Sequence, residues 1–293
     1  MLMIRNKALR QFVGFCQTFN LLQLKLLLKQ PARARSFPGH IYRKYMMLAK
    51  SDGWRATTMD ELVPPAERLK VQLYHLEGGG VCAPLLELAC LALLTRYSNA
   101  HSIFEIGTFR GRTAINFAVN SPDDAKVYTL DLPEHERAEM KSQAKPDDAR
   151  LIGQCRTGVE FHGTQHEEKI RQLYGNSLKF DFSPYYQKMD LVFIDGCHHY
   201  EVVRSDTANA LKIIKPGGLI IWHDFANFGD YHDVTRGVLD MLPGDEIYQI
   251  EDTQLAIYWP NRWKGEAVNA HTSASALSKE SLSAPNAEPI VVA

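Results

Sequence analysis

Short apolar runs alternate with amphipathic stretches along the middle of the chain. Apolar runs of strand length cover residues 102–106, 126–131, 169–174, 189–195 and 218–223, and helical periodicity covers 83–97, 111–119, 178–187 and 201–214. Strands that alternate with helices in this way are typical of a doubly wound α/β fold with a mostly parallel sheet. Beyond these runs, the pattern predicts a helix at 231–242 and a closing hairpin formed by 246–250 and 255–259.

The turn after the first predicted strand is the most informative segment. It runs from Glu105 through Gly107, Phe109 and Gly111, and Asp131 ends the next predicted strand. A glycine turn that opens a helix brings backbone N–H groups to a ligand, and an acidic residue ending the next strand can bind ribose hydroxyls. A dinucleotide site has the spacing Gly-x-Gly-x-x-Gly, but Phe109 stands at its second glycine position. The turn therefore indicates a nucleoside-bearing cofactor without a pyrophosphate.

A second block of motifs follows the fourth predicted strand. It comprises Asp195, Gly196, His198 and Tyr200, then Asp206, the run from Lys215 to Gly218, and finally His223 and Asp224. With the Glu105 turn, this block resembles class I S-adenosylmethionine-dependent methyltransferases of the small-molecule O-methyltransferase-like group (methyltransferase family 24 type). The resemblance covers about residues 80–260. It implies a Rossmann-like sheet of seven strands, mostly parallel, with an antiparallel last strand.

S-adenosylmethionine is the cofactor that the resemblance implies. Its expected contacts are in the first turn and at the strand ends: Glu105, Gly107, Thr108, Phe109, Gly111, Thr113, Asp131, Asn176, Ser177 and Asp195. Asp131 would accept hydrogen bonds from the ribose, and Thr113 would cap the helix or bind the cofactor carboxylate. Glu105 would either brace the turn or contact the ligand directly. Many relatives have Asp at the position of Asn176, whose amide oxygen can still accept a hydrogen bond from the adenine amine.

Catalysis is expected at the ends of two neighbouring strands, where Asp195 and Asp224 would face the cofactor methyl group. A hydroxyl acceptor reacts once its proton is removed or its oxygen is bound to a cation. Asp195 and Asp224 are therefore candidate ligands of a divalent metal such as Mg²⁺, with His198 or His199 beside them. Catechol-type relatives have an Asn ligand directly after the second Asp, where this chain has Phe225, so the third ligand is open.

Histidine offers the metal-free alternative, because its pKa lies near neutral pH. His198 or His223 could act as a general base, and a third interpretation is that these histidines only brace the loops. Asp206 would cap its helix or pair with Arg204 or Arg236.

Charge divides the chain unevenly. The 293 residues are 45% hydrophobic and 23% charged with a formal net charge of −1, yet residues 1–51 hold ten Lys or Arg and no acid. The segment 3–30 could form a helix that docks on the core, a basic helix that touches anionic lipid, or a targeting leader. The chain is thus divided into a basic N-terminal helical extension or cap (1–80), a methyltransferase domain (81–263) and a disordered tail (264–293). Residues 78–81 and 132–168 are candidate loops over the site.

The expected function is methyl transfer from S-adenosylmethionine to a hydroxyl of a small molecule or sugar. Two alternatives are a metal-dependent, hydroxylase-like enzyme of related fold and a non-catalytic cofactor-binding module in a membrane-associated assembly. Five cysteines without Cys-x-x-Cys spacing favour a cytoplasmic setting, with peripheral membrane contact through residues 1–50. The partner is expected to be a small-molecule acceptor rather than nucleic acid, because no recognition motif accompanies the basic terminus. The oligomeric state is not readable from the sequence.

Overall fold

The computed structural model describes residues 53–64, 69–77, 82–136, 156–227, 232–260 and 262. The predicted N-terminal helix and lipid contact, the glycine loop at 78–81, residues 137–155 of the predicted 132–168 loop and the tail from 264 lie outside these residues. Within the described ranges, no helix has both the length and the apolar composition that crossing a membrane requires.

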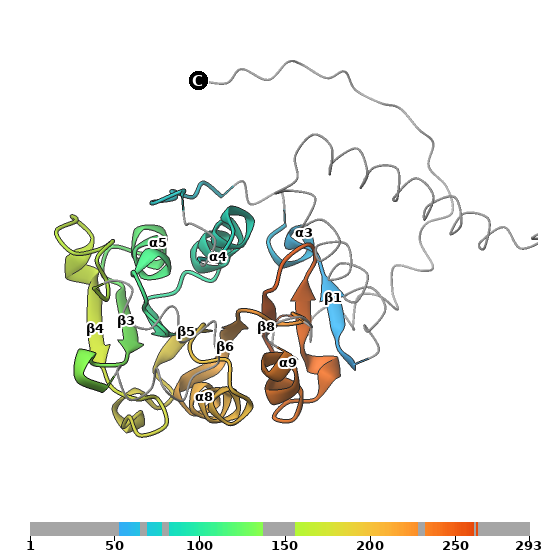
Figure 1. Ribbon diagram of the computed structural model, residues 1–293. Helices are drawn as coiled ribbons and strands as arrows, with labels where there is room; N and C mark the ends of the chain where they lie inside the picture. Colours follow the sequence, from blue (N-terminus) through green and yellow to red (C-terminus); the bar gives the residue numbers. More distant parts are fainter. Residues whose placement is uncertain are drawn as a thin grey trace, which may run out of the picture.

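An eight-stranded sheet forms the centre of the described structure, in the order β1-β7-β8-β6-β5-β2-β3-β4 (Figure 1). The strands are β1 (Arg55–Thr57), β2 (Ser102–Ile106), β3 (Lys126–Asp131), β4 (Ile170–Tyr174), β5 (Met189–Ile194), β6 (Ile214–Trp222), β7 (Tyr248–Ile250) and β8 (Ala256–Tyr258). Strand β8 runs antiparallel to both β6 and β7, and every other pairing is parallel. The predicted doubly wound fold with an antiparallel last strand is confirmed.

Strand β1 adds an edge to the expected seven strands. It comes from the segment assigned to the N-terminal extension and pairs in parallel with β7. Trp54 precedes it and donates a 3.0 Å hydrogen bond from Nε1 to Oε1 of Gln249. Its ring packs edge-on against Phe225, with the ring centroids 5.1 Å apart. Trp54 therefore belongs to the hydrophobic core.

Helices cover both faces of the sheet. Helices α4 (Leu85–Tyr97) and α5 (Arg112–Asn120) lie on one face, and α8 (Tyr200–Ile213) and α9 (His232–Leu239) lie on the other (Figure 1). Neighbouring strand residues divide between the two layers, as their alternating directions require. Leu191 packs with the α4 and α5 residues, while Val192 packs with the α8 and α9 residues. The remaining helical turns are α3 (Met59–Leu62), η3 (Glu167–Lys169), η4 (Ser183–Tyr185) and η5 (Gly244–Glu246).

The prediction of a helix at 178–187 is wrong, because only the single turn η4 forms in that segment. Pro184 has no N–H to donate and disfavours helical geometry at Ser183. Oδ1 of Asp181 accepts a 2.9 Å hydrogen bond from the Ser183 N–H, which is a turn rather than a helix bond. The aromatic residues that gave the segment its apolar pattern, such as Phe182, pack beneath the sheet around Phe104.

Three polar residues of α5, which are Arg112, Asn116 and Asn120, form a polar stripe that binds the backbone of the extended segment 72–76. Asn120 bonds both the N–H and the C=O of Gln72, and Asn116 bonds both backbone groups of Tyr74. Arg112, which is 4% exposed, donates to the carbonyl oxygens of residues 75, 76 and 83. Positions four apart on a helix rise about 6 Å, which matches two residues of an extended chain. The stripe therefore places both described ends of the 78–81 gap beside the N-terminus of α5.

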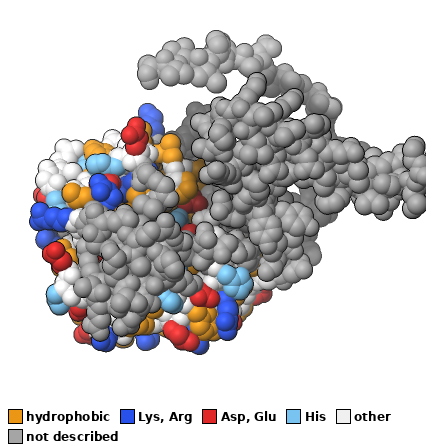
Figure 2. All heavy atoms as spheres, in the orientation of Figure 1, with side chains coloured by type: hydrophobic (Ala, Val, Ile, Leu, Met, Phe, Trp, Pro, Cys, Tyr) orange, Lys and Arg blue, Asp and Glu red, His pale blue; other side chains and the backbone are white. Residues whose placement is uncertain are grey.

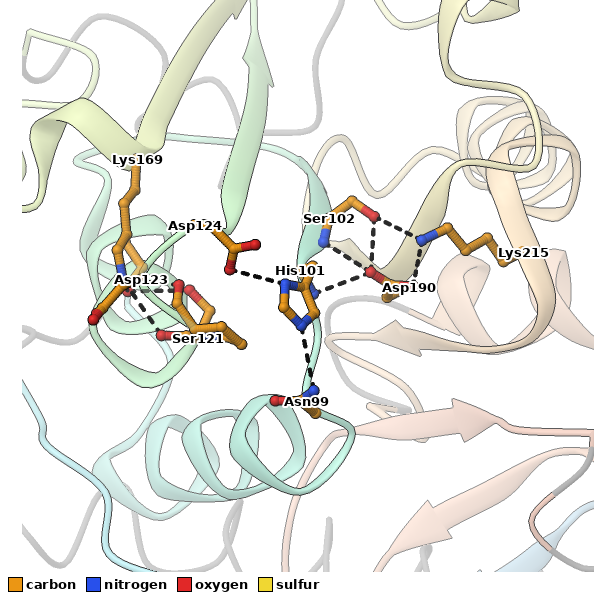
Figure 3. A network of polar contacts seen from close by, with 11 residues as sticks. Asn99, His101, Ser102, Ser121, Asp123, Asp124, Lys169, Asp190 and Lys215 are labelled. Carbon is orange, nitrogen blue, oxygen red and sulfur yellow. Dashed lines mark hydrogen bonds and ion pairs between the residues drawn. The ribbon is translucent and has the colours of Figure 1, made fainter.

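Polar contacts also close the amino-terminal edge of the sheet (Figure 3). Oδ2 of Asp190 accepts hydrogen bonds from the backbone N–H groups of His101 and Ser102 at 3.0 and 2.9 Å. Lys215 lies 2.6 Å from Oδ1 of the same carboxylate, and His101 pairs with Asp124. Burial would raise the pKa of Asp190, but the bonds from Lys215 and Ser102 outweigh it and lower the pKa. This network lies at the edge of the sheet opposite to the predicted site.

On the face shown in Figure 2, described basic and acidic side chains are interspersed with apolar ones.

Candidate active site

Gly107 brings the first turn directly against the end of β5. Its φ is +104°, and its N–H donates a 2.9 Å bond to the carbonyl of Leu130. A Cβ atom at this position would lie 2.0 Å from the carbonyl oxygen of Asp195. Only glycine fits such an approach. The predicted cofactor turn and the predicted catalytic strand end are therefore neighbours.

Gly111 opens α5 and has a left-handed φ of +85°. A Cβ atom here would lie 2.4 Å from the ring of Phe161, so this glycine is also sterically required. The helix begins at Arg112, and no side chain caps it. The predicted cap by Thr113 is wrong because Gly111 already occupies the N-cap position; Thr113 lies in the first turn, half-buried.

Asp131 joins the first turn to the end of β3. Its Oδ2 accepts a 2.7 Å hydrogen bond from the N–H of Phe109, and its Oδ1 accepts one of 2.7 Å from Leu132. The side chain is only half-buried. Phe109 itself has a positive φ of +46°, which the bond to Asp131 stabilises. The carboxylate thus holds the turn, at the strand end where a ribose is expected.

Glu105 lies beneath the turn and is 1% exposed. It accepts a 2.5 Å hydrogen bond from the hydroxyl of Thr129, its register partner on β3. The Thr129 hydroxyl also meets that of Thr108 at 2.6 Å. Burial raises the pKa of Glu105 well above its usual value, against the opposing bond from Thr129. This geometry fits the bracing role of Glu105 rather than direct contact with a ligand.

Asn176 and Ser177 follow β4, on the other side of Asp131. Oδ1 of Asn176 accepts a 3.0 Å bond from the N–H of Leu178, and both Asn176 and Ser177 are half-buried. Behind them lies Asp206, which is 1% exposed. Within the described residues neither of its oxygens has a partner of good hydrogen-bond geometry, although the Ser177 hydroxyl is near enough to oppose the shift of its pKa. Burial raises that pKa to about 7.

The expected role of Asp206 as a helix cap or ion-pair partner is wrong. It lies in the seventh position of α8, far from the N-cap. Arg204 and Arg236 instead lie over the ring of Tyr200, at 5.5 and 4.3 Å from its centroid.

Asp195, His198 and Asp224 converge at the carboxyl edge of β5 and β6. One ligand atom of each lies within 4.8 Å of the others. Nε2 of His198 is 3.1 Å from Oδ2 of Asp224, which is 7% exposed and has a left-handed φ of +54°. Burial would raise the pKa of Asp224, but His223 and His198 outweigh it and hold the pKa well below its usual range. Asp224 is therefore a buried anion with two imidazole partners.

His223 lies between carboxylates on both sides. Its Nδ1 is 3.0 Å from Oδ1 of Asp195 and 3.0 Å from Oδ2 of Asp224. Its Nε2 is 2.8 Å from Oε2 of Glu87 on α4, a carboxylate that is 3% exposed. Burial would lower the pKa of His223, but Asp195 and Asp224 outweigh it and raise the pKa well above its usual value.

The residues at this edge fit a divalent cation. Carboxylate oxygens and imidazole nitrogens are suitable ligands, and three of them are already gathered. Asn227 adds an orphaned polar atom, because within the described chain its buried Oδ1 has no hydrogen-bond partner, while its Nδ2 lies 3.3 Å from Oδ1 of Asp224. The third ligand that the sequence left open could be supplied by His198, since Phe225 is fully buried in the core.

Two site residues escaped sequence reasoning. Glu87 is the single acidic residue of the mostly apolar helix Leu85–Tyr97, and this composition could have indicated a buried carboxylate. Asn227 follows Asp224 by three residues, and nothing in its surroundings signals that the chain turns back at this point.

A cavity of about 500 Å³ opens beside the first turn. It is lined by His75, Leu76, Glu77, Arg110, Val159 and Glu160. Arg110 and Glu160 form an ion pair of 2.6 Å across its wall.

Part of this chain is similar to known methyltransferase domains. Residues 104–225 match the family model described as a methyltransferase domain, a range that includes the first turn and Asp224. Two provisionally named O-methyltransferases, from Mycobacterium avium (strain 104) and Mycolicibacterium paratuberculosis (strain ATCC BAA-968 / K-10), are 28% and 29% identical over 148 residues. The alignment covers 50% of this chain and 57% of each relative.

Several solved structures are similar at lower identity. The O-methyltransferase TomG from Streptomyces achromogenes, in complex with S-adenosylmethionine, gives a TM-score of 0.43 at 17% identity and covers 68% of this chain and 95% of its own. An O-methyltransferase from Bacillus cereus, in complex with S-adenosylhomocysteine, gives 0.40 at 16% identity with coverages of 69% and 88%.

Proposed function

We propose that this chain transfers the methyl group of S-adenosylmethionine to a hydroxyl of a small molecule or sugar, with a divalent cation held at Asp195, His198 and Asp224. The contact between Gly107 and the carbonyl of Asp195 carries the proposal. A cofactor on the first turn would end beside the carboxylate cluster because the two elements touch. The domain match over residues 104–225 supports the same cofactor.

Cofactor binding is proposed to use the carboxyl ends of β2, β3 and β4. The half-buried Asp131 carboxylate would accept hydrogen bonds from the ribose hydroxyls. Asn176 would meet the adenine, and the N–H groups at the start of α5 would face the methionine carboxylate. Thr108 and Glu105 would act through the turn, since their polar atoms are buried and bonded to Thr129.

Acceptor activation is proposed at the ends of β5 and β6. Bound S-adenosylmethionine supplies an activated methyl group, and a bound divalent cation lowers the pKa of a hydroxyl. Asp195 and Asp224 would hold the positive charge there, and the burial of Asp224 would keep competing water away. His223 is a poor candidate base, because both of its ring nitrogens face carboxylates. In the metal-free alternative, His198 would be the better candidate for holding the acceptor proton.

Ligand identification tests this function most directly. Mass spectrometry of the purified protein, followed by thermal shift with S-adenosylmethionine, S-adenosylhomocysteine and NAD, should show stabilisation by the first two alone. Transfer of isotope-labelled methyl to phenol and sugar acceptors would then identify the acceptor class. A shift with metal but not with S-adenosylmethionine would favour the hydroxylase-like alternative. Cofactor binding without any turnover would favour the non-catalytic module.

The cytoplasmic setting and the membrane contact through residues 1–50 remain part of this proposal. The cluster of ten basic residues without an acid supports attraction to anionic lipid. Deletion of residues 1–30 should reduce sedimentation with anionic vesicles while leaving cofactor affinity unchanged. Equal sedimentation of both forms would remove the lipid contact from the proposal.

A further inference from the structure

His223 has a geometry that neither a general base nor a bracing residue requires. Its Nε2 meets Oε2 of Glu87 at 2.8 Å, and its Nδ1 meets carboxylate oxygens of Asp195 and Asp224 at 3.0 Å each. Glu87 is itself fixed, because its Oε1 accepts a 2.7 Å bond from the backbone N–H of Gln254. Both nitrogens of one buried ring are therefore directed at carboxylates.

Glu87 decides which ring nitrogen carries a proton. A carboxylate only accepts, so Nε2 must be the N–H donor, and a neutral ring then presents the lone pair of Nδ1. In the neutral ring, that lone pair faces two further carboxylate oxygens, and a cation shared by the three atoms would make this arrangement favourable. A ring protonated at both nitrogens would instead donate to the two carboxylates. Adjacent ligands of an octahedral ion at about 2.1 Å lie about 3.0 Å apart, as Nδ1 does from the oxygens of Asp195 and Asp224.

We infer that His223 is a further ligand of the proposed cation site through Nδ1, and that Glu87 is the positioning residue that holds its Nε2–H. The inference rests on the proposed cation at Asp195, His198 and Asp224. A histidine ligand whose other N–H donates to a carboxylate is the common arrangement around protein-bound metals, and it fixes the ring orientation. Glu87 is buried to 3% exposure, as such a partner should be.

The donor set also changes which metal the site would take. Two imidazoles and two carboxylates suit first-row transition ions such as Mn²⁺, Fe²⁺, Co²⁺ or Zn²⁺. Mg²⁺ prefers oxygen ligands and keeps several waters. A site containing His198 and His223 therefore selects a transition ion, in contrast to the Mg²⁺ that the sequence suggested.

The test is metal binding by the full chain, measured by calorimetry with Mn²⁺ and with Mg²⁺. Mn²⁺ should bind more tightly than Mg²⁺. His223→Asn should weaken Mn²⁺ binding at least about 10-fold, and Glu87→Gln, which keeps an acceptor for Gln254, should weaken it about 10- to 100-fold. His101→Asn, which removes a histidine at the opposite edge of the sheet, should leave it unchanged. The visible absorption of bound Co²⁺ should change in His223→Asn, and the same spectrum in both proteins would contradict the assignment.

The opposite result is equally clear. If His223 instead neutralises Asp195 and Asp224 as an imidazolium, His223→Asn removes a competing positive charge, and Mn²⁺ should bind more tightly. Unchanged or tighter binding, with loss in Asp195→Asn, overturns the inference and leaves the proposed function standing. A wild-type protein that binds S-adenosylmethionine but no metal overturns the inference and the cation in the proposed function, and leaves methyl transfer itself standing. Failure to bind S-adenosylmethionine, whatever the metal result, would count against the proposed function.

Discussion

The carboxylate of Asp131 accepts a 2.7 Å hydrogen bond from the backbone N–H of Phe109 across the first turn. One side chain thus orders the turn and faces the proposed ribose position. Asp131→Ala should weaken S-adenosylmethionine binding about 10- to 100-fold, since a hydrogen bond to a charged group contributes about 1.5–3 kcal/mol. Calorimetry gives the dissociation constant. Asp123→Ala, an exposed carboxylate in the network of Figure 3, is the control; an unchanged constant in Asp131→Ala would remove the ribose assignment.

Gly107 should be far less tolerant of substitution than Gly163. Both have positive φ, but a Cβ at Gly107 meets backbone atoms of Asp195 at 2.0 Å, whereas at Gly163 nothing lies within 4 Å. Gly163→Ala should cost about 1–2 kcal/mol of unfolding free energy for its conformation alone. Gly107→Ala should cost at least about 3 kcal/mol and abolish cofactor binding, because backbone cannot move aside cheaply. Urea unfolding of the two variants measures the difference, and equal losses would contradict the close approach.

The central strands of the fold could be predicted from the sequence, because the apolar pattern of each strand is local. The runs at 102–106 and 126–131 became β2 and β3 with the predicted bounds, since buried parallel strands are continuous apolar runs between turn residues. The prediction of a helix at 178–187 failed because tertiary contacts, rather than a local pattern, determine the structure of that segment. Its aromatic residues are apolar at helical spacing, but they pack around Phe104 from an irregular turn. Strand β1 was missed because three residues are too short to show a period.

The candidate site was readable where both partners carry a motif. Asp195 and Asp224 end neighbouring strands, so sequence and topology suffice to bring them together. Glu87 reaches His223 from a helix 136 residues earlier, a distance that only the packed structure reveals. The Asn116 and Asn120 contacts are with backbone groups, which have no sequence signature at all.

Asn116 should control the protection of one specific amide. Its Oδ1 accepts a 2.9 Å bond from the N–H of Tyr74, and Asn120 does the same for Gln72. Asn116→Ala should speed hydrogen exchange at Tyr74 at least about 10-fold and cost about 1–3 kcal/mol of stability. The Gln72 amide should stay protected, and Asn120→Ala should reverse the pattern. Exchange that rises equally at both amides in either variant would mean that the segment is released as a whole.

Asp206 should make the free energy of unfolding decrease as the pH rises. Its pKa is about 7 in the folded protein against an ordinary value of 3.8, so between these values the folded state binds one proton more than the unfolded state. The free energy of unfolding then decreases by about 1.4 kcal/mol per pH unit, on the order of 4 kcal/mol across the window, with none lost below pH 4. Asp206→Asn should remove this decrease and gain most at pH 8. Parallel stability curves from urea unfolding at pH 5 and 8 would show that Asp206 ionises normally.

Substitution of Asp224 should lower catalysis but leave the affinity for the cofactor nearly unchanged. It ends β6 beside His198 and His223, whereas the proposed cofactor contacts lie at the ends of β2, β3 and β4. Asp224→Ala should therefore lower kcat by about 10²- to 10³-fold or more, the usual effect of losing a preorganised charge at a reacting centre. The dissociation constant for S-adenosylmethionine should stay within about threefold of wild type on the same argument. Asp245→Ala, an exposed acid in η5, is the matched control. Retained turnover in Asp224→Ala would place the reacting centre elsewhere, and a large loss of cofactor affinity would show that the two halves of the edge are not separable.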